Sequence, residues 1–113
     1  MHESAIAKRV LSVVLDRATA ERASRVVAVR GRVAESERLS NESLAFHFAA
    51  HAVGTIAEGA ELKLDVSSVY VRCDGCGTDY IPEHHVRLCP RCNGSEGQLT
   101  GEEGVWIEDV DVR

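Results

Sequence analysis

The chain has 113 residues, of which 44% are hydrophobic, and a formal net charge of −5 at pH 7. Its length fits one domain, no stretch approaches the roughly 20 apolar residues of a membrane span, and the start lacks a signal-peptide pattern, so we expect a cytoplasmic protein without a membrane partner. The negative charge repels phosphate backbones and therefore disfavours nucleic acid as a partner.

The first part of the chain predicts a helix followed by a strand. Apolar residues recur at helical spacing from Ser4 onward and predict a helix over residues 4–23. The segment RVVAVRGRV at residues 25–33 is rich in β-branched residues, which favour strands. One face of this strand is expected to carry Val27, Val29 and Val33.

A second helix and a second strand are expected next. Ser40 is a typical N-cap residue, and Leu39 and Leu44 have the spacing of a hydrophobic staple. We expect this helix to end at Glu58, just before a glycine. Residues 61–66 alternate between apolar and charged and predict a half-buried strand. Its inward face should carry Leu62, Leu64 and Val66.

Four cysteines form two close pairs, Cys73-x2-Cys76 and Cys89-x2-Cys92, separated by twelve residues. Two residues between cysteines let a tight turn present both sulfurs to one ion, and two such turns supply the tetrahedron that zinc prefers. Because four protein ligands leave no open position for water, the zinc is expected to be structural. A redox dithiol would explain one pair but not two, and iron–sulfur sites have other typical spacings.

The segment between the cysteine pairs has little apolar support of its own. His84 and His85 lie there and could exchange with a thiolate as zinc ligands when the pH falls, although such loop histidines are usually solvated. A zinc ribbon can also serve only as a protein-interaction adaptor, and that alternative stays open here. The expected apolar contacts are Val71, Tyr80, Ile81, Val86 and Leu88.

The last strand is expected at residues 105–112, with a bulge or burial on both faces where the apolar pattern changes parity between Ile107 and Val110. The predicted fold class is α+β, with two helices packed on a small three-stranded mixed sheet and an inserted zinc-ribbon-like module of four cysteines. The strand–helix–strand order favours a parallel crossover. We expect one domain from residues 1–68 plus 99–113 and a zinc-binding module at 69–98.

The chain start, Met1-His2-Glu3, is a candidate chelator. The terminal amine, the His2 backbone nitrogen and the His2 imidazole can close fused chelate rings, and Glu3 can add an amide nitrogen or a carboxylate. Planar sets of nitrogen donors are favoured by Ni(II) and Cu(II). By chemistry alone the signal is weak, because a histidine at position two is usually an accident of a mobile terminus.

Catalysis is disfavoured by the residues present. His47 and His51 are four apart in the expected second helix, but no glutamate stands between them as a general base and no third ligand is evident. They are expected to be polar-face or boundary residues. The sequence has no Walker-type phosphate loop and no nucleophile elbow.

The MHE start, the segment TIAEGAEL at residues 55–62, and the motifs CDGCG and CPRCNG together resemble the HypA/HybF family of hydrogenase maturation factors, over essentially the whole chain. The resemblance implies a nickel metallochaperone without enzymatic activity. It implies nickel bound by Met1, His2 and Glu3. It implies structural zinc at Cys73, Cys76, Cys89 and Cys92.

The resemblance also implies partners, namely a nickel-handling GTPase of the HypB type and the large-subunit precursor of a nickel–iron hydrogenase, with urease maturation proteins in some organisms. A monomer or weak homodimer is expected. One departure from the family pattern is Ser4, where related chains often carry a larger apolar or aromatic residue. This departure leaves the expected ligands intact but changes the packing of the first helix.

Overall fold

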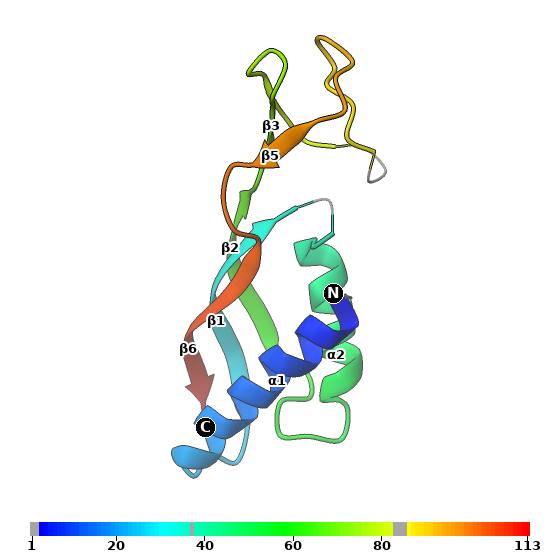
Figure 1. The fold of residues 1–113 in the computed structure, drawn as a ribbon. Helices are drawn as coiled ribbons and strands as arrows, with labels where there is room; N and C mark the ends of the chain where they lie inside the picture. The colour runs from blue at the N-terminus through cyan, green and yellow to red at the C-terminus, as the bar shows by residue number, and fades with distance from the viewer. Residues whose placement is uncertain (1–2, 37, 83–85) are drawn as a thin grey trace.

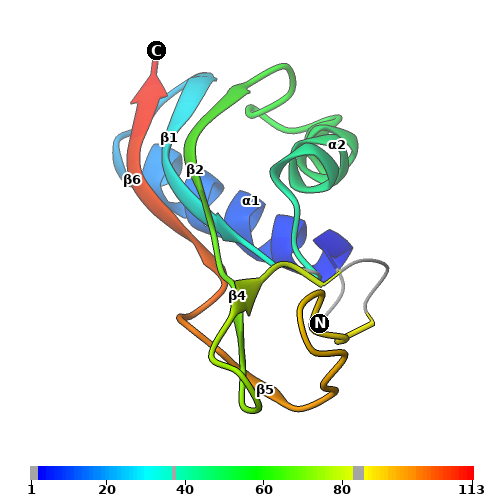
Figure 2. The ribbon, with the colours of Figure 1, turned by 90° about the horizontal axis from the view of Figure 1, so that it is seen from above.

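The computed structural model describes residues 3–36, 38–82 and 86–113, so Met1, His2, His84 and His85 lie outside the described residues. Two helices cover one face of a three-stranded sheet, and a second, smaller sheet projects from one end (Figure 1, Figure 2). The α+β class with a small mixed sheet is confirmed. The described helices include none that is long and apolar enough to cross a membrane.

The main sheet has the strand order β2-β1-β6. Its central strand β1 (Val26–Glu35) pairs in parallel with β2 (Glu61–Ser68) and antiparallel with β6 (Gly104–Val112). The chain passes from β1 to β2 through α2 (Asn41–Ala52), as the predicted crossover requires. The second sheet has the order β4-β3-β5 and is built from short strands. These are β3 (Val71–Cys73), β4 (Asp79–Tyr80) and β5 (Gly97–Leu99).

The first helix, α1 (Glu3–Ala20), ends three residues before the predicted end. Arg22 adopts a left-handed φ of 56°, the Ala23 amide donates to the Ala18 carbonyl, and the Arg22 amide donates to the Thr19 carbonyl. These two bonds form a Schellman motif, which usually has glycine at the left-handed position. Because arginine takes that position here, no glycine marks the end of this helix in the sequence.

Helix α2 begins where it was expected and ends six residues early. The Ser40 side chain accepts the Ser43 amide at 3.2 Å, which confirms the N-cap. After Ala52, Val53 (φ −55°, ψ 130°) and Gly54 (φ 82°) form a tight turn closed by a bond from the Thr55 amide to the Ala52 carbonyl. A glycine with positive φ is typical of a type II turn, so the helix ends at this first glycine.

The core lies between the two helices and the sheet. Leu39 and Leu44 are both buried in this cluster, in agreement with the predicted staple. Phe48 of α2 and Val29 and Val33 of β1 are buried beside them. Several half-buried residues of β2 and β6 complete the cluster at its edges.

Two strand predictions were wrong at single residues. Val27 is 40% exposed, because the β1–β6 pairing shifts register between Val26 and Ala28 and so turns Val26 toward the core instead. Val66 is 51% exposed, because β2 is an edge strand and the core cluster reaches Leu62 and Leu64 but not Val66.

The predicted bulge in the last strand is confirmed. Arg30 pairs with Asp109 and the next residue, Gly31, pairs with Ile107, so Glu108 has no partner on β1. An extra residue of this kind bends a strand and reverses which side chains face the core. The parity change between Ile107 and Val110 therefore follows from the bulge.

Candidate metal centre

The second sheet brings the four cysteines to one place. One sulfur from each of Cys73, Cys76, Cys89 and Cys92 lies within 4.8 Å of the other three. The first cysteine of each pair is buried and the second is exposed. Thiols this close together from two separate segments can all bind one ion.

The two Cys-x-x-Cys turns share one hydrogen-bond pattern. In the first turn, the Cys73 carbonyl accepts a hydrogen bond from the Gly77 amide at 2.9 Å, and the Cys73 amide donates to the Thr78 carbonyl at 2.9 Å. In the second turn, the Cys89 carbonyl accepts from the Asn93 amide at 2.8 Å, and the Cys89 amide donates to the Gly94 carbonyl at 2.9 Å. The residue after each pair has a positive φ, 75° at Gly77 and 60° at Asn93. The backbone therefore curls twice in the same way around the sulfurs, as the small residues at these positions predict.

The sulfur positions fit zinc. Sulfurs around a tetrahedral zinc lie about 3.8 Å apart, given a Zn–S bond of about 2.3 Å. The structure places the Cys73 and Cys92 sulfurs 3.5 Å apart, and those of Cys76 and Cys89 also 3.5 Å apart. A Cβ on Gly94 would stand 3.3 Å from the Cys92 sulfur and 3.4 Å from that of Cys73, so a larger residue would crowd the site.

The thiols influence one another's protonation. The Thr78 hydroxyl, 3.2 Å from the Cys76 sulfur, lowers the pKa of Cys76 to about 6. A hydrogen bond from the Gly94 amide favours the Cys92 thiolate, but the Cys73 and Cys76 thiols outweigh it and raise the pKa of Cys92 to about 12. Neighbouring thiolates repel each other, so full ionisation of the cluster calls for a bound cation.

The support beneath the cysteines is smaller than predicted. Val71 and Tyr80 are buried with Cys73 and Cys89 in a separate small core. The other three expected contacts were wrong, because they lie on the outer surface of the module with about half of each side chain exposed. They are Ile81 (53%), Val86 (54%) and Leu88 (52%).

Glu3, the described member of the expected terminal site, lies in the first turn of α1. Its Oε2 atom is buried and finds no hydrogen-bond partner among the described residues. A buried carboxylate oxygen without a partner is costly unless a donor or a cation completes it. Met1 and His2 lie outside the described residues, so the position of Glu3 relative to them is not tested by the structure.

A contact that the sequence did not reveal lies next to Glu3. Ser4 Oγ is 2.9 Å from His51 Nε2, and this part-buried hydrogen bond joins the start of α1 to the last turn of α2. Both His47 and His51 are half-buried, consistent with boundary positions. The hydrogen bond gives Ser4 a structural role.

Comparison with known proteins identifies the family. A family model described as hydrogenase/urease nickel incorporation, metallochaperone, hypA, matches residues 1–112. The chain belongs to the HypA family. Its members are metallochaperones for nickel incorporation into hydrogenase and urease.

Curated relatives and solved structures agree with this assignment. The hydrogenase maturation factor HypA of Methanopyrus kandleri is 32% identical over 130 residues, covering 97% of this chain and 92% of that protein. The one from Klebsiella pneumoniae is 30% identical over 113 residues, covering 99% of both. The solution structure of the Ni metallochaperone HypA from Helicobacter pylori has the same fold, with a TM-score of 0.62 at 15% identity over 99% of this chain and 97% of that one.

Proposed function

We propose that this HypA-family protein carries Ni(II) at its chain start, bound by the Met1 amine, the His2 nitrogens and Glu3. The buried Glu3 oxygen without a partner among the described residues is the observation that carries this proposal, because it offers a negative oxygen at the position where a cation is expected. Nitrogen-rich donor sets suit Ni(II) better than the four thiolates do.

In this proposal the four cysteines hold Zn(II), which supplies no chemistry and only fixes the fold of the β3–β4–β5 module. Four sulfur ligands close the coordination shell, so no position is left for a substrate. The protein therefore acts without catalytic turnover. A zinc–thiolate site needs reduced cysteines, which a cytoplasmic location maintains.

Nickel transfer would proceed by ligand exchange. A site held by few ligands at a chain terminus lets a partner add its own donors before the chaperone releases the ion. The partners proposed are a HypB-type nickel GTPase and the large-subunit precursor of a nickel–iron hydrogenase, with urease maturation proteins as a further candidate. The proposed assembly state is a monomer or weak homodimer.

The decisive experiment compares His2→Ala with wild type in untagged protein. Nickel stoichiometry measured by calorimetry and metal analysis should fall to the background level, while zinc stays at one per chain and the circular dichroism spectrum is unchanged. The matched control is His47→Ala, which removes an imidazole from α2 and should keep nickel binding.

Wild-type nickel binding by His2→Ala would refute the terminal site. The alternative function, a zinc-ribbon adaptor without a nickel role, predicts that neither variant changes nickel binding. The two functions are therefore separated by a single titration.

A further inference from the structure

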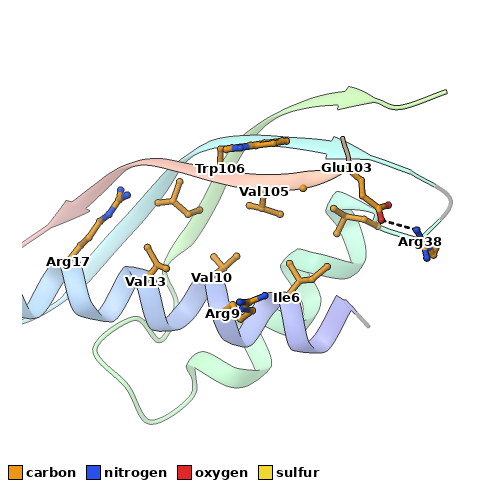
Figure 3. A pocket seen from close by; sticks show the side chains of 12 residues that line it. Ile6, Arg9, Val10, Val13, Arg17, Arg38, Glu103, Val105 and Trp106 are labelled. Carbon is orange, nitrogen blue, oxygen red and sulfur yellow. Dashed lines mark hydrogen bonds and ion pairs between the residues drawn. The ribbon is translucent and has the colours of Figure 1, made fainter. Parts of the chain in front are cut away.

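An open groove of about 530 Å³ lies between α1 and β6 (Figure 3), and neither the four cysteines nor Glu3 line it. Its floor is apolar. Val13 is 41% exposed, and Ile6 and Val105 are half-buried. The Trp106 ring points to the other face of the sheet (Figure 3), where the Arg32 guanidinium lies 4.3 Å from the ring centre. Apolar side chains left partly open in one groove are typical of an interaction site.

The rim of the groove is basic although the whole chain carries a charge of −5. Arg38 is paired with Glu103 at 3.3 Å, so these two charges cancel. Arg9 and Arg17 are exposed, and neither forms an ion pair with any residue that the structure describes. The groove therefore presents two uncompensated positive charges above an apolar floor.

The groove also borders a free strand edge. In the described part of the chain, β6 pairs with β1 alone, so its other edge has no partner strand. The bulge at Glu108 bends the second half of β6, and the Val110 amide there is bonded to its neighbour Asp109 at 3.1 Å. Bulges of this kind prevent further pairing. Residues 104–107, which line the groove, are left as the part of the edge that can accept another strand.

We propose that this groove binds an extended segment of a partner protein, which adds to β6 as a strand along Gly104–Ile107. Arg9 and Arg17 are eight residues apart on α1, about 12 Å along the helix axis. That length equals roughly four residues of a strand, whose side chains on one face repeat every second residue. The segment therefore carries two Asp or Glu residues about four apart, with an apolar residue midway between them that covers Val13 and Val105.

Strand addition supplies affinity through backbone hydrogen bonds, while the side-chain pockets and charges select the sequence. Nucleic acid is disfavoured as the occupant because the protein as a whole is acidic. This inference is independent of the nickel site, since it uses none of the proposed ligands.

The test is selection of a displayed library of random peptides, about twelve residues long, on the full-length zinc-loaded protein. Selected peptides should show the acidic and apolar spacing described above and should shift the amide resonances of residues 104–107. Arg9→Glu combined with Arg17→Glu should weaken their binding roughly tenfold or more, as the loss of two exposed ion pairs predicts.

Lys8→Glu is the matched control for Arg9→Glu, because Lys8 is the neighbouring exposed cation on α1 but does not line the groove. It should leave peptide binding unchanged. Val13→Glu is a second test variant. It changes the apolar floor of the groove and leaves Arg9 and Arg17 in place. Nickel and zinc contents should stay at wild-type values in all of these variants.

Three outcomes would overturn the proposal. Selected peptides could be basic or show no common pattern. The double Arg variant could bind as tightly as wild type. The shifts at residues 104–107 could appear without peptide as the concentration and the apparent mass rise together, which would make a second copy of this chain the occupant.

Discussion

At the scale of single residues, the contact between Ser4 and His51 joins the start of α1 to the end of α2. It lies one residue from Glu3, so it restricts the orientation of the first turn of α1. A part-buried hydrogen bond of this kind contributes about 1 kcal/mol to stability.

We expect Ser4→Ala to lower the free energy of unfolding by about 1 kcal/mol, measured by urea denaturation. His51→Ala should cost a similar amount, and the double variant should cost less than the sum of the two, because both substitutions remove the same bond. Strict additivity would show that the hydrogen bond contributes nothing. The matched control is Ser12→Ala, which removes the hydroxyl of an exposed serine of α1 and should leave the free energy of unfolding unchanged.

Gly31 gives a second residue-scale prediction. A Cβ at this position would overlap the Trp106 carbonyl oxygen on the neighbouring strand, which is backbone and cannot move aside easily. Gly31→Ala is therefore expected to destabilise the protein by about 2 kcal/mol or more. Gly101→Ala is the control, because nothing lies within 4 Å of a Cβ there and the change should stay within about 0.5 kcal/mol. Equal melting temperatures for the two variants would contradict the prediction.

At the scale of elements, the sequence predicted those features that depend on residue type and on the spacing of nearby residues. The Ser40 cap, the β1–α2–β2 order and the gathering of four cysteines all follow from residue type and spacing. The same is true of the bulge in β6, where two apolar residues fall on opposite parities.

The failures at this scale came from features that have no local signal or depend on tertiary packing. Arg22 adopts a left-handed conformation that usually belongs to glycine, so the end of α1 could not be located. The exposure of Val66 depends on how far the core extends along an edge strand. The groove between α1 and β6 depends on two segments that are far apart in sequence, and the hydrogen bond between Ser4 and His51 does too.

The stability of the small sheet, β3–β4–β5, is expected to depend on the bound metal. Among the residues that the structure describes, its buried core consists of Val71, Cys73, Tyr80 and Cys89, too little to hold three short strands in place without metal. We expect a strong chelator to abolish amide protection in β3, β4 and β5 while β1 and β2 keep theirs, as followed by hydrogen exchange. The zinc contribution of roughly 10 kcal/mol far exceeds what this core can supply. Retained protection in the chelated protein, or collapse of both sheets together, would contradict this expectation.

At the scale of the whole molecule, the protein is elongated. Its radius of gyration is 17.0 Å and its extents are 55 × 21 × 16 Å, whereas a compact chain of this length would have a radius near 13 Å. The excess comes from the cysteine module, which extends beyond the end of the main sheet opposite the C-terminal residue (Figure 1).

The two chain ends should differ in their tolerance of fusions. The C-terminal residue Arg113 pairs with Arg25 at the end of the β1–β6 ladder, so an extension there leaves the proposed nickel ligands free. An N-terminal tag converts the terminal amine to an amide and should abolish nickel binding, whereas the same tag at the C-terminus should not. Calorimetry on both fusions checks this, and equal nickel binding would exclude the amine as a ligand.

The junction between the two sheets has a consequence for protein engineering. Tyr70 and Thr100 hold the outgoing and returning chain together through hydrogen bonds of 2.8 Å and 3.2 Å, and the Val69 amide is bonded to the Glu35 carbonyl at 2.7 Å. The inserted segment thus starts and ends at the place where Tyr70 and Thr100 are hydrogen-bonded to each other. The entropic cost of closing a loop there grows only slowly with the length of the loop. An unrelated hairpin or binding peptide could be grafted between these two residues while β2 and β6 keep their register, giving chimaeras in which the remainder of the protein is unchanged.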